Sequence, residues 1–269
     1  MPTFSSNLDL AVGIPTHNNA RTIERSLQSL QNLATRVVIA DSGSTDGTIE
    51  LCQSYGAEVI PRDWPGHARQ KQFLLDQCAD HTWAMLIDSD ESLEPDLATS
   101  IRRVIEENDP AYDAWAVNRK VWFHGGWLHH CLQPEWRTRL ARGGKGRMKD
   151  LDHNDGNNIA MLHDAIIVDG QTGKLSGDLR HDSWENLADM CHRNINYGKL
   201  LASYDIPGGS LTRIMLSPPA AFLKQYLLKR GFLDGKRGLI CSGGVAAGVL
   251  MKHLFIALKK SNLDPDSGE

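Results

Sequence analysis

Four short predicted strands, each followed by a predicted helix, constrain the fold more than any other feature of this sequence. They are residues 10–14, 37–40, 58–60 and 83–87, of which all but the third are apolar runs. Regular alternation of strands and helices is typical of a parallel sheet that carries helices on both faces. The pattern therefore predicts an α/β fold over roughly the first hundred residues of the chain.

Polar clusters follow three of these predicted strands, at the points where the strands end. The clusters are Thr16 to Asn18, Asp41 to Asp46 and Asp88 to Glu91. Ligands of open α/β sheets bind beyond the carboxyl ends of the strands. Because the ends of parallel strands share one edge, these clusters predict a ligand site at that edge.

Asp88 and Asp90 stand one residue apart at the end of an apolar run. Two carboxylates so close repel each other unless a cation lies between them. Mg²⁺ or Mn²⁺ takes oxygen ligands and commonly combines one or two carboxylates with substrate phosphates. A metal site is one interpretation of this pair, and a solvated acidic turn is the other, because Asp-x-Asp often occurs by chance.

Several other ligand sites are excluded by their spacing. An EF-hand loop needs Gly at its sixth position, where this chain has Leu93. The glycine-rich residues 143–146 lack the spacing of a P-loop, and no Gly-x-Gly-x-x-Gly follows the first predicted strand. Asp41 is placed to accept a hydrogen bond from a base or ribose, while Ser42, Ser44 and Thr45 are placed to cap the next helix.

Three segments together resemble the signatures of family 2 inverting glycosyltransferases, which have a GT-A fold. They are Pro15-Thr-His-Asn18, Asp41-Ser-Gly-Ser-Thr-Asp-Gly-Thr48 and Ile87-Asp-Ser-Asp-Glu91. The resemblance implies a mixed, mainly parallel sheet flanked by helices, with a C-terminal helical basic segment. It also implies an enzyme that transfers a hexose.

Further segments, in order along nearly the whole chain, are similar to one subgroup, the lipopolysaccharide core β-1,4-glucosyltransferases. They are residues 64–72, Pro134-Glu135 with Arg139-Leu140, Leu162-His-Asp164, Gly177-Asp-Leu-Arg-His181, Ala221-Phe-Leu-Lys224 and Gly231-Phe-Leu-Asp-Gly-Lys236. This subgroup implies UDP-glucose as the donor. The implied acceptor is a glycolipid or oligosaccharide of the lipopolysaccharide core or a related cell-envelope glycan.

The resemblance assigns a role to individual residues. The residues that would hold the nucleotide base and ribose are Pro15, Thr16, Asn18 and Asp41. Arg69 would approach the uridine or the diphosphate. Asp88 would face the ribose or the metal, Asp90 would ligate Mg²⁺ or Mn²⁺, and His181 would approach the metal or diphosphate. Asp164 would be the general base.

The base assignment departs from the subgroup, which usually has Glu at the position of Asp164. Asp155 and Glu135 are therefore alternatives. Whichever carboxylate acts must lie within hydrogen-bond reach of the acceptor hydroxyl to remove its proton. Residues 143–158 also differ from the relatives, and this loop would face the acceptor.

The C-terminal part of the chain differs from the rest in charge. Residues 219–260 contain eight Lys or Arg residues and a single acidic residue, Asp234. Apolar residues recur there at helical spacing: Phe222, Leu223, Tyr226 and Leu227. The combination is typical of a basic amphipathic helix on an anionic membrane. The alternative is a helix packed on the catalytic domain with its lysines in water.

We expect a catalytic domain over residues 1–210 and a helical, membrane-associating segment over residues 211–269. The most apolar stretch, residues 239–258, contains Lys252, His253 and three glycines, which makes it a poor transmembrane helix by hydropathy. These features predict a protein held peripherally on the inner face of the cytoplasmic membrane.

Composition agrees with a cytoplasmic location. The five cysteines are widely spaced and form no Cys-x-x-Cys pair, so neither a disulfide framework nor a structural zinc site is expected. Residues 1–10 lack the basic and apolar regions of a secretory signal. A formal net charge of −4 gives no reason to expect a nucleic-acid partner.

Two other functions compete with glycosyl transfer. A sugar nucleotidyltransferase also has a parallel sheet and acidic metal ligands, but it should carry a Gly-rich, Arg-containing loop after the first strand, where this chain has residues 15–19. A membrane-docking protein with the same fold and no activity is the second alternative. The presence of Asp88, Asp90 and a candidate base argues against it.

Overall fold

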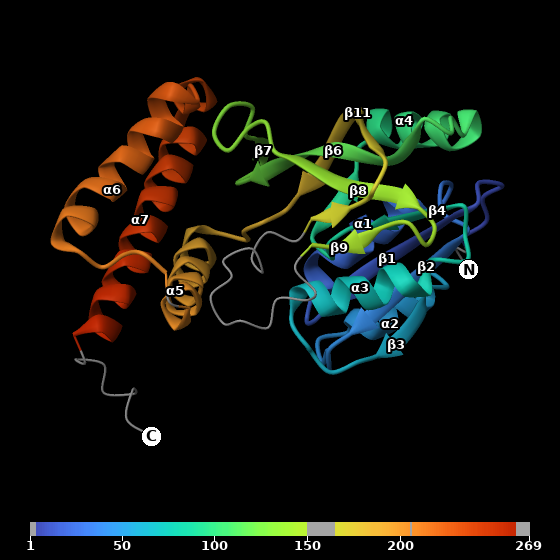
Figure 1. Cartoon of the computed structure of the whole chain (residues 1–269), viewed down its shortest axis with the longest axis horizontal. Coiled ribbons are helices and arrows are strands. Elements are labelled where there is room, and N and C mark those ends of the chain that lie inside the picture. Colours follow the sequence, from blue (N-terminus) through green and yellow to red (C-terminus); the bar gives the residue numbers. More distant parts are fainter. Residues whose placement is uncertain (1–3, 150–164, 205, 262–269) are drawn as a thin grey trace. The chain divides into compact units, whose positions relative to one another are not determined.

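A computed structural model describes residues 4–149, 165–204 and 206–261, which divide into two compact units (Figure 1). Among the described residues, unit 1 comprises 4–119, 135–149 and 165–182. Unit 2 comprises 120–134, 183–204 and 206–261. Each unit has its own hydrophobic core.

Unit 1 is built on a mixed sheet. Its parallel strands stand in the order β3 (Glu58–Pro61), β2 (Arg36–Asp41), β1 (Leu10–Thr16) and β4 (Trp83–Leu86). The sheet continues through β8 (Trp136–Arg142), β6 (Tyr112–Phe123), β11 (Gln171–His181) and β5 (Glu91–Leu93). Here β8 runs antiparallel to both β4 and β6, and β11 antiparallel to β5. A separate pair of short strands consists of β9 (Arg147–Met148) and β10 (Ile166–Ile167).

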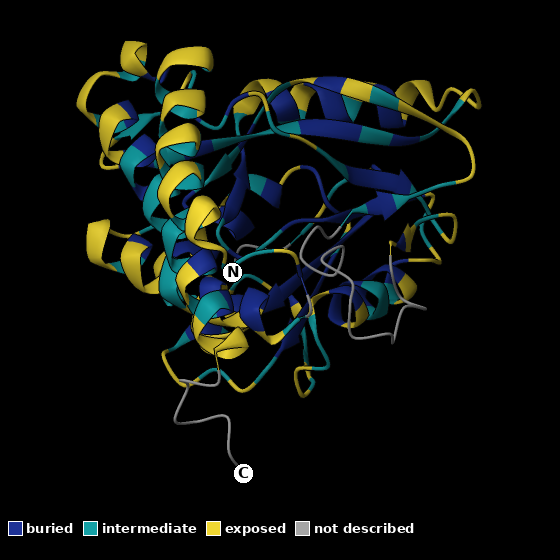
Figure 2. Cartoon of the chain, turned by 60° about the vertical axis from the view of Figure 1, so that its left-hand side comes forward, coloured by how far each residue is buried: buried dark blue, intermediate teal, exposed yellow. Residues whose placement is uncertain are grey.

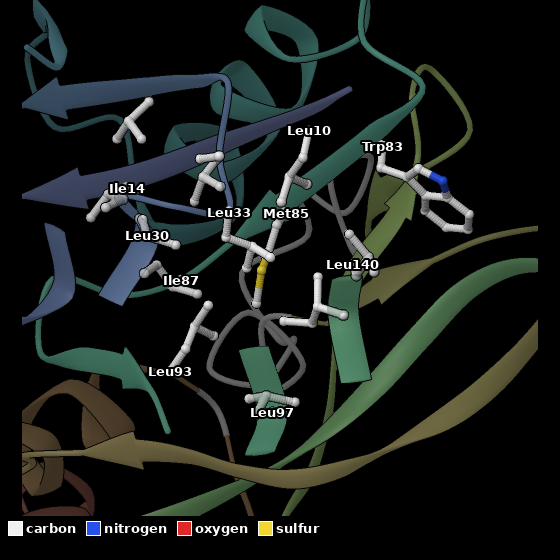
Figure 3. Packing of buried hydrophobic residues seen from close by; sticks show 14 of the residues in the cluster. Leu10, Ile14, Leu30, Leu33, Trp83, Met85, Ile87, Leu93, Leu97 and Leu140 are labelled. Carbon is white, nitrogen blue, oxygen red and sulfur yellow. The ribbon is translucent and has the colours of Figure 1, made fainter. Parts of the chain in front are cut away.

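Helices cover both faces of this sheet because its strands are apolar on both sides. The helices are α1 (Ala20–Leu30), α2 (Thr48–Ser54), α3 (His67–Gln77) and α4 (Pro95–Glu107). Successive side chains of a strand point to opposite faces. Leu10 and Ile14 therefore join one core cluster with α1 and α4, whereas Ala11 joins a second cluster with α3. Figure 3 shows the first cluster from close by.

Gly13 in β1 lets α3 approach the sheet closely. A Cβ atom at this position would lie 2.8 Å from the Cβ atom of Leu74. No larger residue fits there without moving the helix. The contact matters for the site described below, because α3 carries several of its side chains.

Unit 2 consists mainly of three helices. They are α5 (Leu187–Ser203), α6 (Leu211–Leu223) and α7 (Gly235–Lys260), and both α5 and α6 pack on α7. A π-helical turn, η2 (Lys224–Leu228), and a 3₁₀ turn, η3 (Gly231–Asp234), join α6 to α7. The short strand β7 (Gly126–Trp127) pairs with the end of β6.

The mixed sheet, its flanking helices and the C-terminal helices are confirmed as the resemblance to a GT-A fold implied. The two units differ from the expected division into residues 1–210 and 211–269. Because α5 packs along α7, it groups with the C-terminal helices, as do residues 120–134.

One helical stretch of the described residues, Gly231–Lys260, is long and apolar enough to cross a membrane by length and composition. Its most apolar 18-residue window has a mean hydropathy of 1.7, and 28% of that window is buried. The expectation that residues 239–258 fail this hydropathy test is therefore wrong. The surrounding apolar residues outweigh Lys252 and His253.

Candidate active site

The loops that follow β1, β2 and β4 meet at one edge of the sheet in unit 1. Thr16, the last residue of β1, is the register partner of Asp41 at the end of β2. Beyond the end of β4, the Ile87 N–H donates to the carbonyl of Gly13 in β1. The three polar clusters predicted from the sequence therefore lie at the carboxyl ends of adjacent parallel strands.

Asp41 organises the loop that follows β2. Its carboxylate accepts hydrogen bonds from the N–H of Gly43 (3.0 Å), from the N–H of Ser44 (2.9 Å) and from the Ser44 hydroxyl (2.5 Å). The residue is only 2% exposed. An ionised carboxylate offers about four acceptor positions, so one position remains for an incoming hydroxyl or amide.

Asn18 ties the first loop to the second. Its N–H donates to the Ser44 hydroxyl at 2.8 Å, and its side-chain carbonyl accepts from the Thr45 N–H at 2.8 Å. The residue has a φ of 52°, in the left-handed region that Asn tolerates better than most residues. The two loops thus form one connected wall.

Pro15 and Thr16 are buried residues of β1 behind this wall. The Thr16 hydroxyl has no hydrogen-bond partner among the described residues. The expected capping of α2 by Ser42, Ser44 and Thr45 is wrong, because Asp46 instead accepts from the Thr48 N–H at 3.1 Å.

Asp88 lies between two cations. One carboxylate oxygen forms an ion pair with Lys71 of α3, and the other accepts from Arg139 of β8 at 2.8 Å. The side chains of Lys71 and Arg139 are each only 3% exposed. Burial favours the neutral acid, but Lys71 and then Arg139 outweigh it and hold the pKa of Asp88 well below its ordinary value.

A second buried carboxylate, Glu91, completes this network. Its side chain is fully buried, accepts from Arg139 at 2.6 Å and accepts from the Asp88 N–H at 3.0 Å. Arg119 approaches the same carboxylate at 3.5 Å. The network fixes the turn that carries Asp88 and Asp90, so the positions of these aspartates depend on residues from α3, β6 and β8.

Asp90 lies beside His181, 91 positions further along the chain. The His181 Nε2 atom is 3.6 Å from an Asp90 carboxylate oxygen, and both side chains are about 15% exposed. Pairing of β5 with β11 produces this contact, because it places His181 opposite Glu91. The Asp182 N–H also donates to the Asp90 carbonyl at 2.9 Å.

These two side chains fit a shared divalent cation. Ligand atoms about 2.1 Å from Mg²⁺ are at most about 4.2 Å apart, which accommodates the observed separation. Among residues 4–149, 165–204 and 206–261, no group of three His, Cys, Asp or Glu side chains is arranged to hold a metal ion. Asp88 is already engaged by Lys71 and Arg139. A cation here would therefore need further oxygen ligands from a substrate.

Arg69 lies on the first turn of α3 and is exposed to solvent. The neighbouring Gln70 is buried, and its amide N–H₂ lies 3.3 Å from the Ser42 hydroxyl and 3.4 Å from the Ala40 carbonyl. These contacts place the start of α3 beside the loop that follows β2. The Arg69 side chain has no hydrogen bond or ion pair with any described residue.

Of the three candidates for the general base, the structure describes only Glu135. Asp164 and Asp155 lie outside the described residues. Glu135 is bound by Arg119 at 2.7 Å and by Arg137 at 2.6 Å. Burial opposes ionisation of Glu135, but the hydrogen bond from Arg119 leads the contributions that lower its pKa to about 2. So weak a base is unsuited to removing a proton from a hydroxyl near neutral pH.

The sequence led to Asp88 and Asp90 but gave no role to the cations that hold Asp88. Lys71 and Arg139 both stand in segments that resemble the glucosyltransferase subgroup, and this was the only sequence signal for their importance. Nothing in the local pattern shows that α3 and β8 bring them together with Glu91.

Comparisons with known proteins agree with these features. The sequence model described as "Glycosyl transferase family 2" matches residues 11–168. The "Lipopolysaccharide core biosynthesis glycosyltransferase LpsC" of Rhizobium meliloti (strain 1021) is 29% identical, over 96% of this chain and 97% of the relative. An uncharacterized glycosyltransferase of Rickettsia conorii is 31% identical, over 85% and 83% of the two chains.

Solved structures also align with the chain. A mannosyltransferase from Pyrobaculum calidifontis, in complex with GDP-Man and Mn²⁺, is 17% identical, with 99% of this chain and 90% of that chain aligned. The TM-score is 0.45, a likeness too loose to say anything about the ligands of this chain.

Proposed function

The chain belongs to glycosyl transferase family 2, and we propose that it transfers a hexose from a nucleotide sugar, UDP-glucose, to a saccharide of the lipopolysaccharide core or a related cell-envelope glycan. The alignment of 96% of this chain with LpsC, a glycosyltransferase of lipopolysaccharide core biosynthesis, supports the acceptor class. The observation that carries the proposal is the approach of Asp90 and His181 at the carboxyl edge of the sheet.

We propose that Asp90 and His181 would hold Mg²⁺ or Mn²⁺ together with oxygen ligands from the diphosphate of the donor and from water. A diphosphate is a poor leaving group until its growing negative charge is neutralised, which is the chemistry that a bound divalent cation supplies. Asp88 serves a different purpose, because its charge is compensated by Lys71 and Arg139. We propose that Asp88 faces the ribose of the donor and keeps the turn before Asp90 in place.

The nucleoside of the donor is proposed to lie against the wall formed by the first two loops. Asp41 retains one acceptor position, and the buried hydroxyl of Thr16 lacks a partner among the described residues. Pro15 and Asn18 shape the same wall. The exposed guanidinium of Arg69 is proposed to bind the diphosphate, because a guanidinium can donate two parallel hydrogen bonds to a phosphate group.

Asp164 is proposed as the general base that takes the proton from the acceptor hydroxyl. Inversion requires the hydroxyl to attack the anomeric carbon from the side opposite the leaving diphosphate. A carboxylate on the acceptor side must therefore be free to accept a proton. Glu135, which two arginines bind, does not meet that condition.

We further propose that the protein works peripherally on the inner face of the cytoplasmic membrane. Its proposed acceptor is anchored there by lipid, and the helices of unit 2 expose many apolar side chains.

The substitution Asp90→Ala tests the assignment. We expect loss of UDP release from UDP-glucose with Mn²⁺ and a lipopolysaccharide-core acceptor, with an unchanged circular dichroism spectrum. Asp96→Ala, at an exposed position on the first turn of α4, is the matched control and should keep full activity. Undiminished turnover in the Asp90 variant would rule the assignment out.

The product that is released separates the competing functions. A sugar nucleotidyltransferase would release pyrophosphate from UTP and a sugar phosphate, and an inactive docking protein would release neither product. For the base, Asp164→Asn should retain UDP binding by calorimetry and lose transfer. Transfer that survives this change would place the base elsewhere.

A further inference from the structure

Helix α6 has an entire face that no other part of its unit covers. None of its residues is buried, and the most exposed are Leu211 (76%), Met215 (64%) and Leu216 (63%). Residues four or seven apart lie on the same side of a helix. Leu211 and Met215 therefore share one side, Leu216 and Leu223 (49% exposed) share the adjacent side, and together they form a broad apolar stripe. A helix of this length presents about 20 Å of continuous apolar surface.

The stripe extends into the turn that follows the helix. Leu227 and Leu228 of η2 are 51% and 80% exposed. We call the six residues of this surface the α6 face: Leu211, Met215, Leu216, Leu223, Leu227 and Leu228. The C-terminal helices carry long runs of exposed residues (yellow in Figure 2), in contrast to the buried strands of the sheet.

This part of the chain is strongly basic. Residues 206–261 contain nine Lys or Arg residues, and Asp234 is their only acidic residue. The Asp234 side chain is 1% exposed and accepts hydrogen bonds from the backbone N–H groups of His129, His130 and Cys131. Within residues 206–261, the single negative charge is therefore buried, and the charged side chains that reach solvent are all cations.

Three of those cations are exposed in or soon after the segment that carries the α6 face. The side chains of Lys224, Arg230 and Lys236 have no hydrogen bond or ion pair with any described residue, and Lys224 and Arg230 stand one and two positions from Leu223 and Leu228 in the chain. Leucines and a methionine bordered by free lysines and arginines are the pattern of helices that lie in the interface of an anionic bilayer. A protein partner of opposite charge would satisfy the cations but leave about 20 Å of aliphatic surface to be matched separately.

We propose that the α6 face lies in the headgroup region of an anionic phospholipid bilayer, with the axis of α6 parallel to the membrane surface. The choice of a membrane rests on the proposed function, because the acceptor there is lipid-linked. The apolar surface and its basic border are independent of that function.

The packing of α5 on α7 argues against a bilayer-spanning α7 and is consistent with α6 lying parallel to the membrane surface. Helix α5 contacts the middle of α7, where Gly244 abuts Met190 and Gly198 lies against the backbone of Met251 and Lys252. Helix α5 carries the exposed residues Arg193 and Lys199. A spanning α7 would draw these charges into hydrocarbon, which is costly.

Vesicle sedimentation with the full chain tests the proposal. Vesicles of phosphatidylcholine with 30% phosphatidylglycerol should bind at least tenfold more protein than vesicles of phosphatidylcholine alone, and 0.5 M NaCl should remove most of the difference. The double variant Met215→Gln, Leu216→Gln should lose at least tenfold in binding. The matched control Leu200→Gln, at an exposed position on α5, should bind like the wild type.

Four outcomes would overturn the proposal. Equal binding to neutral and anionic vesicles would remove the role of the basic border, and unchanged binding of the double variant would remove the α6 face. Resistance of the cellular protein to alkaline carbonate extraction would indicate a spanning helix. A dimer of the wild type that the double variant loses would identify a second copy of this chain as the partner.

The fold and the proposed function are checked separately. The double variant should retain the circular dichroism spectrum and UDP affinity of the wild type, because the α6 face is remote in sequence from the nucleotide loops. If vesicle binding follows the expected pattern but no sugar is transferred, the proposed function fails and the membrane surface stands. The converse result would retain the enzyme and reject the surface.

Discussion

Of the seventeen large apolar side chains exposed among the described residues, fifteen belong to unit 2 and only two, Trp64 and Trp136, belong to unit 1. The cores differ in the same way. Two large clusters fill both faces of the sheet in unit 1, whereas six buried residues make up the cluster of unit 2.

The difference shows that unit 1 buries almost all of its large apolar side chains, whereas unit 2 leaves many of them exposed. Unit 1 places even its charges inside, where Lys71, Arg139, Asp88 and Glu91 neutralise one another. Unit 2 leaves apolar surface outside beside unpaired cations. Free apolar surface of this extent in a soluble protein usually marks an interaction site.

Among the tests of this difference between the two units, the largest expected effect is on the free energy of unfolding when a buried charge of unit 1 is removed. Arg139→Met removes one cation from Asp88 and Glu91 together, and breaking a buried pair in this way costs about 3–5 kcal/mol. The free energy of unfolding, measured by urea titration, should fall by that amount. The variant Arg103→Met, at an exposed position on α4 with only a long ion pair to Glu107, should change it by less than about 0.5 kcal/mol. Equal effects of the two changes would mean that the network is not a stabilising centre.

Truncating one leucine in each unit compares the two regions directly. Leu27 of α1 is fully buried, so Leu27→Ala should lower the free energy of unfolding by about 2–5 kcal/mol. Leu228 is 80% exposed, so Leu228→Ala should change it by less than about 0.5 kcal/mol in the absence of lipid. A large loss from the Leu228 change would contradict the assignment of that residue to a free surface.

A smaller effect is expected from pH, through Glu135. Its pKa falls from 4.5 to about 2 on folding, so its carboxylate is more acidic in the native state. The stability that it contributes is present above about pH 4.5 and is lost as the pH falls towards 2. Glu135→Gln should therefore flatten the dependence of the unfolding free energy on pH in that window. An unaltered slope would show that Arg119 and Arg137 do not lower the pKa of Glu135.

The smallest effect concerns the medium. Adding anionic vesicles should raise the melting temperature of the wild type by a few degrees, because a ligand that binds only the folded state stabilises it. The variant Met215→Gln, Leu216→Gln should show no such rise. A shift of equal size in both proteins would detach the effect from the α6 face.

The sequence predicted the first half of unit 1 well because β1, β2 and β4 contain apolar runs and helical spacing of apolar residues returns between the strands. It missed β11, in which only Leu175 and Leu179 of eleven residues are buried. It also missed β5, because the buried Glu91 resembles part of a polar turn until Arg139 is known to face it.

The exposed surface of unit 2 was predicted only in part. Helical spacing pointed to Phe222 and Tyr226, but their rings stack on each other at 5.2 Å and are partly buried. The exposed stripe begins earlier, at Leu211. Which side of an apolar helix faces solvent depends on where α7 packs, and the pattern within α6 does not report that contact.

The interleaving of the two units along the chain has a consequence for how the protein can change. Residues 120–134 contribute Val121, Phe123, Leu128 and Cys131 to the cluster that Met190 and Cys241 complete. A premature stop codon after residue 182 would therefore not shed a dispensable tail. It would expose the apolar side chains of residues 120–134 that the helices bury, so a chain without the helices would carry an unprotected hydrophobic cluster.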